Sequence, residues 1–350
     1  MNKDVYLVEL NKLKNLMIQV ADTPFVMYAK VLALVTMNMR YEKVAFNMDL
    51  KDHPYSLTRE IIKDAINQFK ALIDISFIES DDKNIKSFKS QIKEEKHRKL
   101  FDEIWNRYDE KNFEQYIDRY VHRIKINSLG GLIENKSCVD LGCGNGVFCF
   151  ALLNYGAGFV AGVDFGEKSI TYARNVARKK RLGAEVMFKQ TTLYETGFED
   201  NAFDFAIQNG VFHHLEDEQK AIRETKRILK KGGWFWYYTD GEGGISYDLW
   251  DASVEMLKDV PVLFLEGILE SMNVNRNKIV HLSDGLSATY AHTSWDKITK
   301  KLSDKGFGNF RRLKGGFETD FDLDKIEPDP YGKEKFGEGD LRILCQLLEK

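Results

Sequence analysis

The sequence lacks the features of a membrane or exported protein. Its amino terminus has no basic segment followed by an apolar core, and its longest apolar run, residues 25–39, is interrupted by Lys30 and is too short to span a bilayer. Cysteine is scarce: there are four, at positions 138, 143, 149 and 345, and none forms a Cys-x-x-Cys pair. We therefore expect a cytoplasmic protein with reduced thiols, without zinc or disulfide bonds.

The chain also lacks an excess of either charge. Its 350 residues include 51 basic and 54 acidic side chains, which give a formal net charge of −3. Such a protein has no general field that would draw it to nucleic acid or anionic lipid. We predict neither a nucleic-acid nor a membrane partner. The mixed charges of residues 79–99 indicate a solvated linker, with a local nucleic-acid patch as the alternative.

No glycine occurs before Gly130. Apolar residues at helical spacing predict helices over residues 5–20 and 25–39, and Ser56 or Thr58 is the expected cap of a third helix. These patterns indicate an N-terminal helical domain over residues 1–95, which is also our candidate surface for a homodimer.

Aromatic and charged residues alternate over residues 101–126. Their spacing places Tyr116, Arg119, Tyr120 and Arg123 on one face of a helix. Two hypotheses for the role of this helix stay open. The helix packs on the following sheet through its aromatic side chains, or it is a lid whose tyrosine or arginine reaches a ligand.

From Ser137 the pattern changes to strand, turn and helix, repeated. The expected strands cover residues 138–141, 159–163, 186–189, 203–208 and 234–239. Short apolar strands that alternate with amphipathic helices predict an α/β fold with a parallel, doubly wound sheet.

After Asp240 this alternation stops. Helices are expected over residues 245–258, 262–272 and 295–302, the last capped by Thr293, and two late strands over 307–313 and 341–348 could pair antiparallel. Residues 314–340 are long for a loop and rich in glycine and acid.

The turn after the first strand carries the strongest chemical signal. Glycines at 142, 144 and 146 allow a ligand to approach the backbone, and Asp164 ends the second strand, where a carboxylate can accept both hydroxyls of a ribose. The spacing differs from the Gly-x-Gly-x-x-Gly of dinucleotide sites. Asp140 would repel a pyrophosphate but could meet a ligand ammonium.

These motifs resemble those of class I S-adenosylmethionine-dependent methyltransferases. Residues 139–146, Val-Asp-Leu-Gly-Cys-Gly-Asn-Gly, resemble the first motif of that family, Asp164 its ribose ligand, residues 203–215 its fourth-strand motif, and residues 222–233 the helix and turn before its fifth strand. The resemblance covers about residues 130–240. It implies a Rossmann-like methyltransferase sheet, mostly parallel with an antiparallel last strand, and S-adenosylmethionine as the cofactor.

The resemblance also implies a domain layout and a cofactor site. Residues 96–240 would form the core with its preceding lid helix, 241–294 a helical insertion that caps the acceptor pocket, and 295–350 the rest of the sheet. The expected cofactor-binding residues are Asp140, Gly142, Cys143, Gly144, Asn145, Asp164, Phe165, Thr192, Leu193 and Gln208, with Tyr116 and Arg123 from the lid helix. Thr192 stands where the family often has an aspartate, so it offers adenine no carboxylate. Leu193 can still supply backbone and apolar contacts.

A sulfonium methyl is already activated, so the protein must position a nucleophile and remove its proton. His213, His214 and His292 are the candidate bases, with His281 a weaker one. Motifs of nucleic-acid methylation are absent from the sequence. We therefore expect an enzyme that methylates an oxygen or nitrogen of a small molecule, such as a sugar, a polyketide or a quinone-like ring. The alternatives are an NAD(P)-dependent oxidoreductase and a non-catalytic cofactor-binding scaffold.

Overall fold

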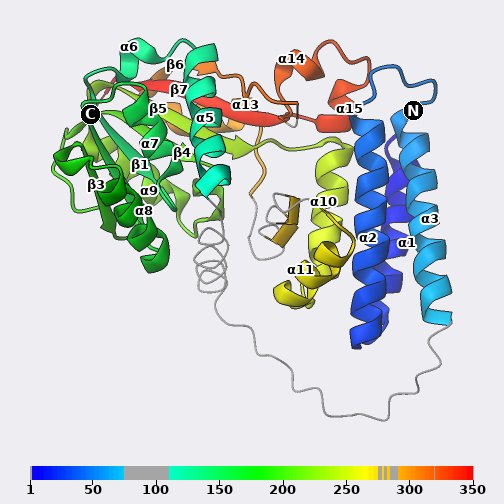
Figure 1. Ribbon diagram of the computed structural model, residues 1–350. Helices are drawn as coiled ribbons and strands as arrows, with labels where there is room; N and C mark the ends of the chain where they lie inside the picture. The colour runs from blue at the N-terminus through cyan, green and yellow to red at the C-terminus, as the bar shows by residue number, and fades with distance from the viewer. Residues whose placement is uncertain are drawn as a thin grey trace. The chain divides into compact units, whose positions relative to one another are not determined.

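A computed structural model describes residues 2–74, 110–274, 278–279, 282–283, 291–318 and 320–349. The chain divides into two compact units (Figure 1). The helical unit comprises Met1–Lys93, Glu242–Ala288 and Lys325–Gly337, and the sheet unit comprises Glu94–Gly241, Thr289–Asp324 and Glu338–Lys350. His281 and the linker predicted over residues 79–99 lie outside the described residues.

The sheet unit is built on one sheet of seven strands in the order β3-β2-β1-β4-β5-β7-β6. The strands are β1 (Ser137–Leu141), β2 (Phe159–Asp164), β3 (Val186–Gln190), β4 (Phe203–Asn209), β5 (Leu229–Asp240), β6 (Phe307–Arg312) and β7 (Asp340–Leu347). The first five pair in parallel, and β7 runs antiparallel to both β5 and β6. This topology confirms the predicted doubly wound sheet with an antiparallel last strand.

Side chains alternate between the two faces of this sheet, because successive residues of a strand point to opposite sides. Cys138 and Trp236 face a core completed by helices α5 (Glu110–Ile126), α7 (Val147–Asn154) and α8 (Glu167–Lys179). Val139 and Tyr237 face a second core completed by α9 (Glu218–Ile228) and α13 (Trp295–Ser303). Both faces are therefore buried, which explains why the strands are apolar throughout.

The helices of the sheet unit follow the predicted pattern. They are α5 (Glu110–Ile126), α6 (Gly130–Ile133), α7 (Val147–Asn154), α8 (Glu167–Lys179), α9 (Glu218–Ile228) and α13 (Trp295–Ser303), with 3₁₀ turns η2 (Gly183–Glu185) and η3 (Phe212–His214). The cap of α13 is Ser294, which accepts a hydrogen bond from the Lys297 amide, so the prediction of Thr293 was wrong by one residue. Thr293 instead forms a parallel bridge with Gly241.

Strand β5 begins earlier than predicted. Leu229 pairs with Phe203, and Trp234 pairs with Phe205, so the register of the two strands shifts between these pairs. Gly232 lies in the shifted part of β5. Gly232 has a φ of +81°, which a residue with a side chain rarely adopts. The Gly-Gly turn that suggested a strand start is therefore a kink within the strand.

The helical unit is assembled from three separated parts of the chain. Its helices are α1 (Asp4–Gln19), α2 (Pro24–Ala45), α3 (Pro54–Asp74), α10 (Gly244–Leu257), α11 (Val262–Ser271) and α15 (Gly332–Phe336). Helix α3 begins at Pro54, so Ser56 and Thr58 lie inside it and do not cap it. The expected long loop over residues 314–340 contains α15 and α14 (Leu323–Ile326).

A buried lysine fixes the last of these parts in the helical unit. Lys335 is fully buried, and its ammonium group donates 2.7 Å hydrogen bonds to the Asp329 carboxylate and to the Asn47 carbonyl. Tyr41 on α2 donates to the Lys335 carbonyl at 3.2 Å. The segment that the sequence presented as a loop therefore belongs to the core of this unit.

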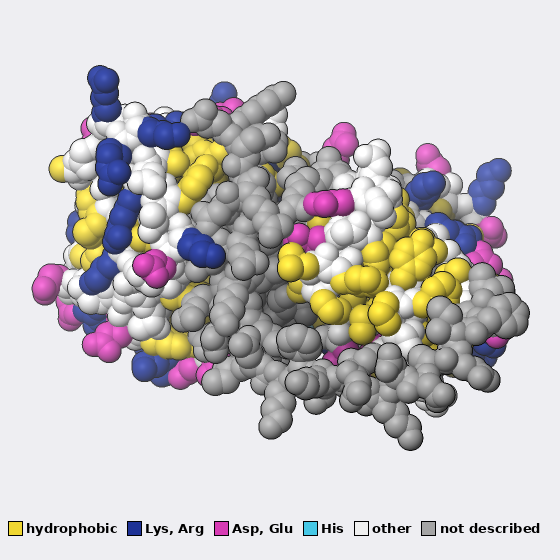
Figure 2. Space-filling model, turned by 60° about the horizontal axis from the view of Figure 1, so that its bottom comes forward, with side chains coloured by type: hydrophobic (Ala, Val, Ile, Leu, Met, Phe, Trp, Pro, Cys, Tyr) yellow, Lys and Arg dark blue, Asp and Glu magenta, His cyan; other side chains and the backbone are white. Residues whose placement is uncertain are grey.

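Among the described residues, no helix is long and apolar enough to cross a membrane. The helical unit carries several exposed large apolar side chains, and Figure 2 shows hydrophobic side chains gathered on its surface. The exposed large apolar side chains of this unit are Val8, Ile18, Tyr28, Met39, Phe46, Met48 and Leu263. A homodimer through the N-terminal helices stays a prediction, as does a cytoplasmic location.

A cluster of buried ions connects β7 to the segment before it. The guanidinium of Arg342, 2% exposed, donates to Asp322 at 2.7 Å, Asp340 at 2.9 Å and Asp320 at 3.0 Å. Burial disfavours the charge on Asp320, but Arg342, Arg123 and Arg119 together outweigh it and lower the pKa of that carboxyl. Burial raises the pKa of Asp322 despite Arg342.

Replacing Arg342 by Met should reduce the free energy of unfolding of the sheet unit by about 3–5 kcal/mol, because it leaves three buried carboxyl groups without their shared partner. Urea denaturation measures this loss. The matched control is Arg119→Met, since the side chain of Arg119 is 30% exposed and lies 3.3 Å from the same Asp320. The control should lose no more than about 1 kcal/mol. Equal losses in the two variants would contradict the role given to the cluster.

Candidate functional site

The glycine turn lies between β1 and α7, at the carboxyl end of β1. Gly142, Gly144 and Gly146 have φ values of +88°, +51° and +84°. A Cβ added to Gly142 would lie 2.6 Å from Val211, and one added to Gly146 would lie 2.8 Å from Phe188, so packing explains both glycines. Around a Cβ on Gly144, no atom of the described residues lies within 4 Å. Open space therefore adjoins the middle of the turn.

Asp164, the last residue of β2, holds this turn in place. Its Oδ2 accepts a hydrogen bond of 2.9 Å from the Gly144 amide, and its Oδ1 accepts one of 2.8 Å from the Gly166 amide. A carboxylate can accept about four hydrogen bonds, so these two do not exhaust it. The open space beside Gly144 and the adjacent carboxylate together fit a ribose diol.

Asp140 precedes the turn by two residues and is 2% exposed. The Cys149 thiol on α7 donates to its Oδ2 at 3.5 Å. Burial is the main reason that the pKa of Asp140 is raised, to about 7; the Cys149 hydrogen bond lowers the pKa and the charge of Asp164 raises it.

Two further turn residues are buried. Cys143 is 7% exposed, and burial raises the pKa of its thiol to about 11. Asn145 is 2% exposed, and its side-chain Nδ2 has no hydrogen-bond partner among the described residues. An unpaired buried amide is costly, so a group that accepts a hydrogen bond from it would stabilise the turn.

The expected contacts to adenine lie after β2 and β3. Phe165 is half-buried, and its carbonyl accepts a hydrogen bond from Gln190 at 3.2 Å. Thr192 is exposed, and its hydroxyl accepts a hydrogen bond from the Tyr194 amide. The side chain of Leu193 is buried in the core on the α9 face of the sheet. Contacts of these residues with a cofactor stay predictions.

Gln208 on β4 has hydrogen-bond partners within the protein, and its contact with the cofactor stays a prediction. It is fully buried, and its Nε2 donates to the Tyr238 carbonyl at 2.8 Å. Its Oε1 accepts hydrogen bonds from the amides of Val211 and Phe212 at 3.0 and 3.2 Å. Gln208 therefore holds the turn that leads to His213.

Arg123, predicted to contact the cofactor, forms hydrogen bonds within the protein. It donates to the Gly315 carbonyl at 3.0 Å and to Asp320 at 2.9 Å, and it is 5% exposed. These buried contacts fix α5 to the segment before β7, and a contact of Arg123 with the cofactor stays a prediction.

On α5, Tyr120 contacts the helix that follows the glycine turn. Its ring stacks on Phe148, the second residue of α7, at 4.3 Å between centroids and 11° between planes. The Asn209 side chain, at the end of β4, donates to the Tyr120 hydroxyl at 3.1 Å. Tyr116, the predicted contact, is half-buried against the core of this face. Helical spacing placed both tyrosines on one side of α5 and could not choose between them.

His213 and His214 form a hydrogen-bonded pair in η3. Their Nε2 atoms are 2.9 Å apart, and Nδ1 of His213 lies 3.1 Å from the hydroxyl of Thr239 on β5. A hydrogen bond between two imidazoles needs one N–H and one lone pair, so the pair shares a proton. His213 is 7% exposed and His214 is half-buried. The pair can accept a proton from a neighbouring nucleophile.

His292 is half-buried and lies next to the end of β5. The amide of Thr293 donates to the Asp240 carbonyl at 3.4 Å. The chain at His292 therefore meets the same strand that carries Thr239, the partner of His213. The described residues contain no group of three or more His, Cys, Asp or Glu side chains that could hold a metal.

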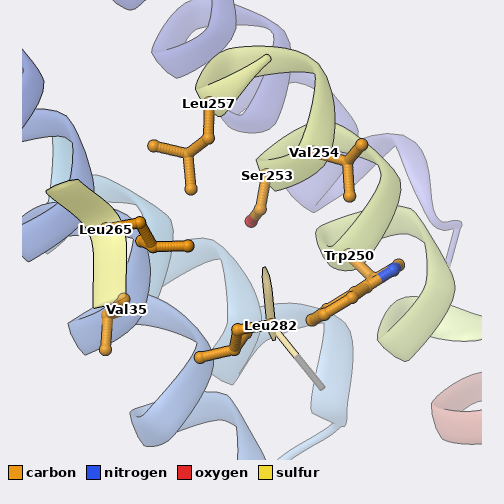
Figure 3. A pocket seen from close by; sticks show the side chains of 7 residues that line it. All are labelled: Val35, Trp250, Ser253, Val254, Leu257, Leu265 and Leu282. Atoms are coloured by element: carbon orange, nitrogen blue, oxygen red, sulfur yellow. The ribbon is translucent and has the colours of Figure 1, made fainter. Parts of the chain in front are cut away.

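The helical unit contains an apolar pocket (Figure 3). Around Ser253, it is lined by Val35, Trp250, Val254, Leu257, Leu265 and Leu282. The Ser253 hydroxyl donates to the Leu249 carbonyl at 2.7 Å and accepts from Asn38 at 2.9 Å. This lining suits an apolar group and offers no charged partner for a nucleoside with an ammonium and a carboxylate.

Comparison with known proteins gives a match over part of the chain. Residues 139–237 match the family described as a methyltransferase domain. The uncharacterized methyltransferase YcgJ of Bacillus subtilis is 33% identical over 131 residues, which are 36% of this chain and 51% of that protein. The demethylmenaquinone methyltransferase of Staphylococcus aureus is 31% identical over 148 residues, 40% of this chain and 58% of that protein. The chain spans about half the length of these curated relatives.

Likeness to solved structures is weaker. The crystal structure of YcgJ aligns with a TM-score of 0.43 at 17% identity, over 67% of this chain and 99% of that one, and it adds nothing to the topology described above. The matched segment contains the glycine turn, Asp164 and the His213–His214 pair. Residues 139–237 of this chain are therefore similar to a methyltransferase domain.

Proposed function

We propose that this protein transfers the methyl group of S-adenosylmethionine to an oxygen or nitrogen of a small molecule. The observation that carries the proposal is the open space over Gly144 next to the Asp164 carboxylate, within a segment that matches the methyltransferase family. A nucleoside placed there would meet a hydrogen-bonding partner for its ribose in the Asp164 carboxylate.

The chain's own residues would hold this cofactor at three points. Asp164 would accept hydrogen bonds from the ribose hydroxyls, the backbone around Gly144 would lie against the ligand, and Asp140, when ionised, would attract its ammonium group. The cofactor supplies a methyl group activated by its sulfonium. The protein then needs to align the nucleophile, which is worth about 7–11 kcal/mol of the barrier in favourable cases.

The His213–His214 pair is our candidate for the general base. Thr239 orients the ring of His213, and His213 in turn contacts His214. Such a chain fixes the ring positions and lets one ring accept the proton of the attacking group. His292 stays a second candidate, because its segment joins the end of the same strand.

The names of the relatives support a small acceptor. They include a ubiquinone biosynthesis O-methyltransferase of Bordetella avium, the demethylmenaquinone methyltransferase of Staphylococcus aureus and a 27-O-demethylrifamycin SV methyltransferase of Amycolatopsis mediterranei. We therefore place quinone-like rings first in an acceptor screen, followed by polyketides and sugars.

Asp164→Ala should weaken binding of S-adenosylhomocysteine, measured by calorimetry, at least about a hundredfold, because hydrogen bonds to a charged group contribute about 1.5–3 kcal/mol each. The control is Asp200→Ala, since that carboxylate is 68% exposed and pairs with Arg227. Its affinity should equal that of the wild type. Unchanged affinity in a folded Asp164→Ala variant would refute the ribose assignment, and binding of NAD instead would favour an oxidoreductase.

His213→Ala or His214→Ala should slow the formation of S-adenosylhomocysteine by about 10²- to 10⁴-fold with an acceptor found in the screen, while cofactor affinity is retained. His122→Ala is the matched control, because this exposed histidine contacts Phe317 away from η3. Wild-type rates in both η3 variants would exclude the pair as the base. A fall in cofactor affinity without a fall in rate would assign it to binding.

A further inference from the structure

The carboxylate of Asp140 depends on one thiol. Among the described residues, the Cys149 Sγ is its one hydrogen-bond donor, at 3.5 Å from Oδ2. Both side chains are buried, Asp140 to 2% exposure and Cys149 completely. Asp140 lies on β1, two residues before Gly142, and Cys149 lies on α7, the helix that follows the glycine turn. The contact between the two side chains therefore spans the turn.

Among the described residues, the other titratable groups near this carboxylate give it no positive charge. Asp164 on β2 adds a negative charge, Cys143 in the turn is a thiol held near Cys149, and Tyr120 on α5 is a phenol. Burial, followed by the contacts with Cys143 and Asp140, raises the pKa of Cys149 well above its usual value. Cys149 therefore stays protonated at neutral pH and stays a donor.

A donor to a carboxylate favours its ionised form, whereas burial favours the neutral acid. At Asp140 these effects oppose each other, and burial raises the pKa of this carboxyl to about 7. The group is thus balanced between its two forms near neutral pH, and a small change in the hydrogen bond shifts that balance.

We propose that Cys149 is a positioning residue whose thiol holds Asp140 and sets the pH above which the protein binds S-adenosylmethionine tightly. The inference rests on the proposed function, since it takes the ammonium of the cofactor as the partner of Asp140. Below that pH, binding the cation requires Asp140 to release its proton. Cofactor binding is then coupled to proton release.

Calorimetry with S-adenosylhomocysteine from pH 5.5 to 8.0, in two buffers of different ionisation enthalpy, tests this coupling. In the wild type, affinity should fall by up to about tenfold per pH unit below a midpoint near neutrality, with proton release seen as a buffer-dependent heat. Cys149→Ala removes the donor and should move the midpoint up. Cys149→Ser supplies a stronger donor and should move it down. Asp140→Asn should abolish the pH dependence.

Cys345→Ala is the matched control. Its thiol is also completely buried and contacts the Phe235 carbonyl, away from Asp140. The midpoint of this variant should equal that of the wild type. A common midpoint for the wild type, Cys149→Ala and Cys149→Ser, or a wild-type affinity independent of pH, would overturn the proposal.

Thermal melting without ligand gives a second readout. A carboxyl whose pKa is raised on folding stabilises the protein at low pH and loses that contribution as pH rises through the folded value. The melting temperature of Asp140→Asn relative to wild type should therefore increase as pH rises from 5 towards the folded pKa of Asp140 and then level off. Measured relative to Cys149→Ala, the increase should continue to a higher pH, because loss of the donor raises the folded pKa further. Absence of ligand binding at every pH would refute the proposed function, while these melts would still decide the role of Cys149.

Discussion

The hydrogen bond from the Gly144 amide to the Asp164 carboxylate is the contact on which the candidate site depends. It joins the turn after β1 to the end of β2, and it holds Gly144 in a left-handed conformation that few other residues adopt. The same carboxylate binds the Gly166 amide at the start of α8. One side chain thus fixes three backbone segments around the space where a ribose would lie.

The remaining site residues come from the carboxyl ends of neighbouring strands, which the parallel order brings to one edge of the sheet. Asp140 lies near the end of β1, Asn209 ends β4, and Thr239 lies near the end of β5. Helix α5 adds Tyr120, which stacks on the start of α7 and contacts Asn209. Asp140, Asp164 and His213 are each held by a second group, whereas the Nδ2 of Asn145 has no partner among the described residues. Most of the candidate site is therefore preorganised, which is the property that the proposed methyl transfer would require.

Local patterns allowed the sheet to be predicted, because the short apolar strands and the glycine turn are each encoded within a few consecutive residues. The turn, Asp164 and the histidine pair could be found in this way. The roles of Gln208, Arg123 and Tyr120 could not, since they depend on tertiary partners: Arg123 pairs with Asp320, which is 197 residues later in the chain. The sequence of residues 325–337 resembles a loop because its buried residue Lys335 is charged. Lys335 can be buried only because its ammonium group donates to Asp329 and to Asn47, and Asn47 is far away in sequence. Hydrophobic pattern alone does not report buried ion pairs.

A crystal structure of the full chain with S-adenosylhomocysteine tests the central claim most directly. We predict that the ligand lies over Gly144, with both ribose hydroxyls within hydrogen-bond distance of the Asp164 carboxylate and the amino group on the side of Asp140. A ligand bound elsewhere, for example in the apolar pocket beside Trp250, with Asp164 in contact only with its two backbone amides, would contradict the account.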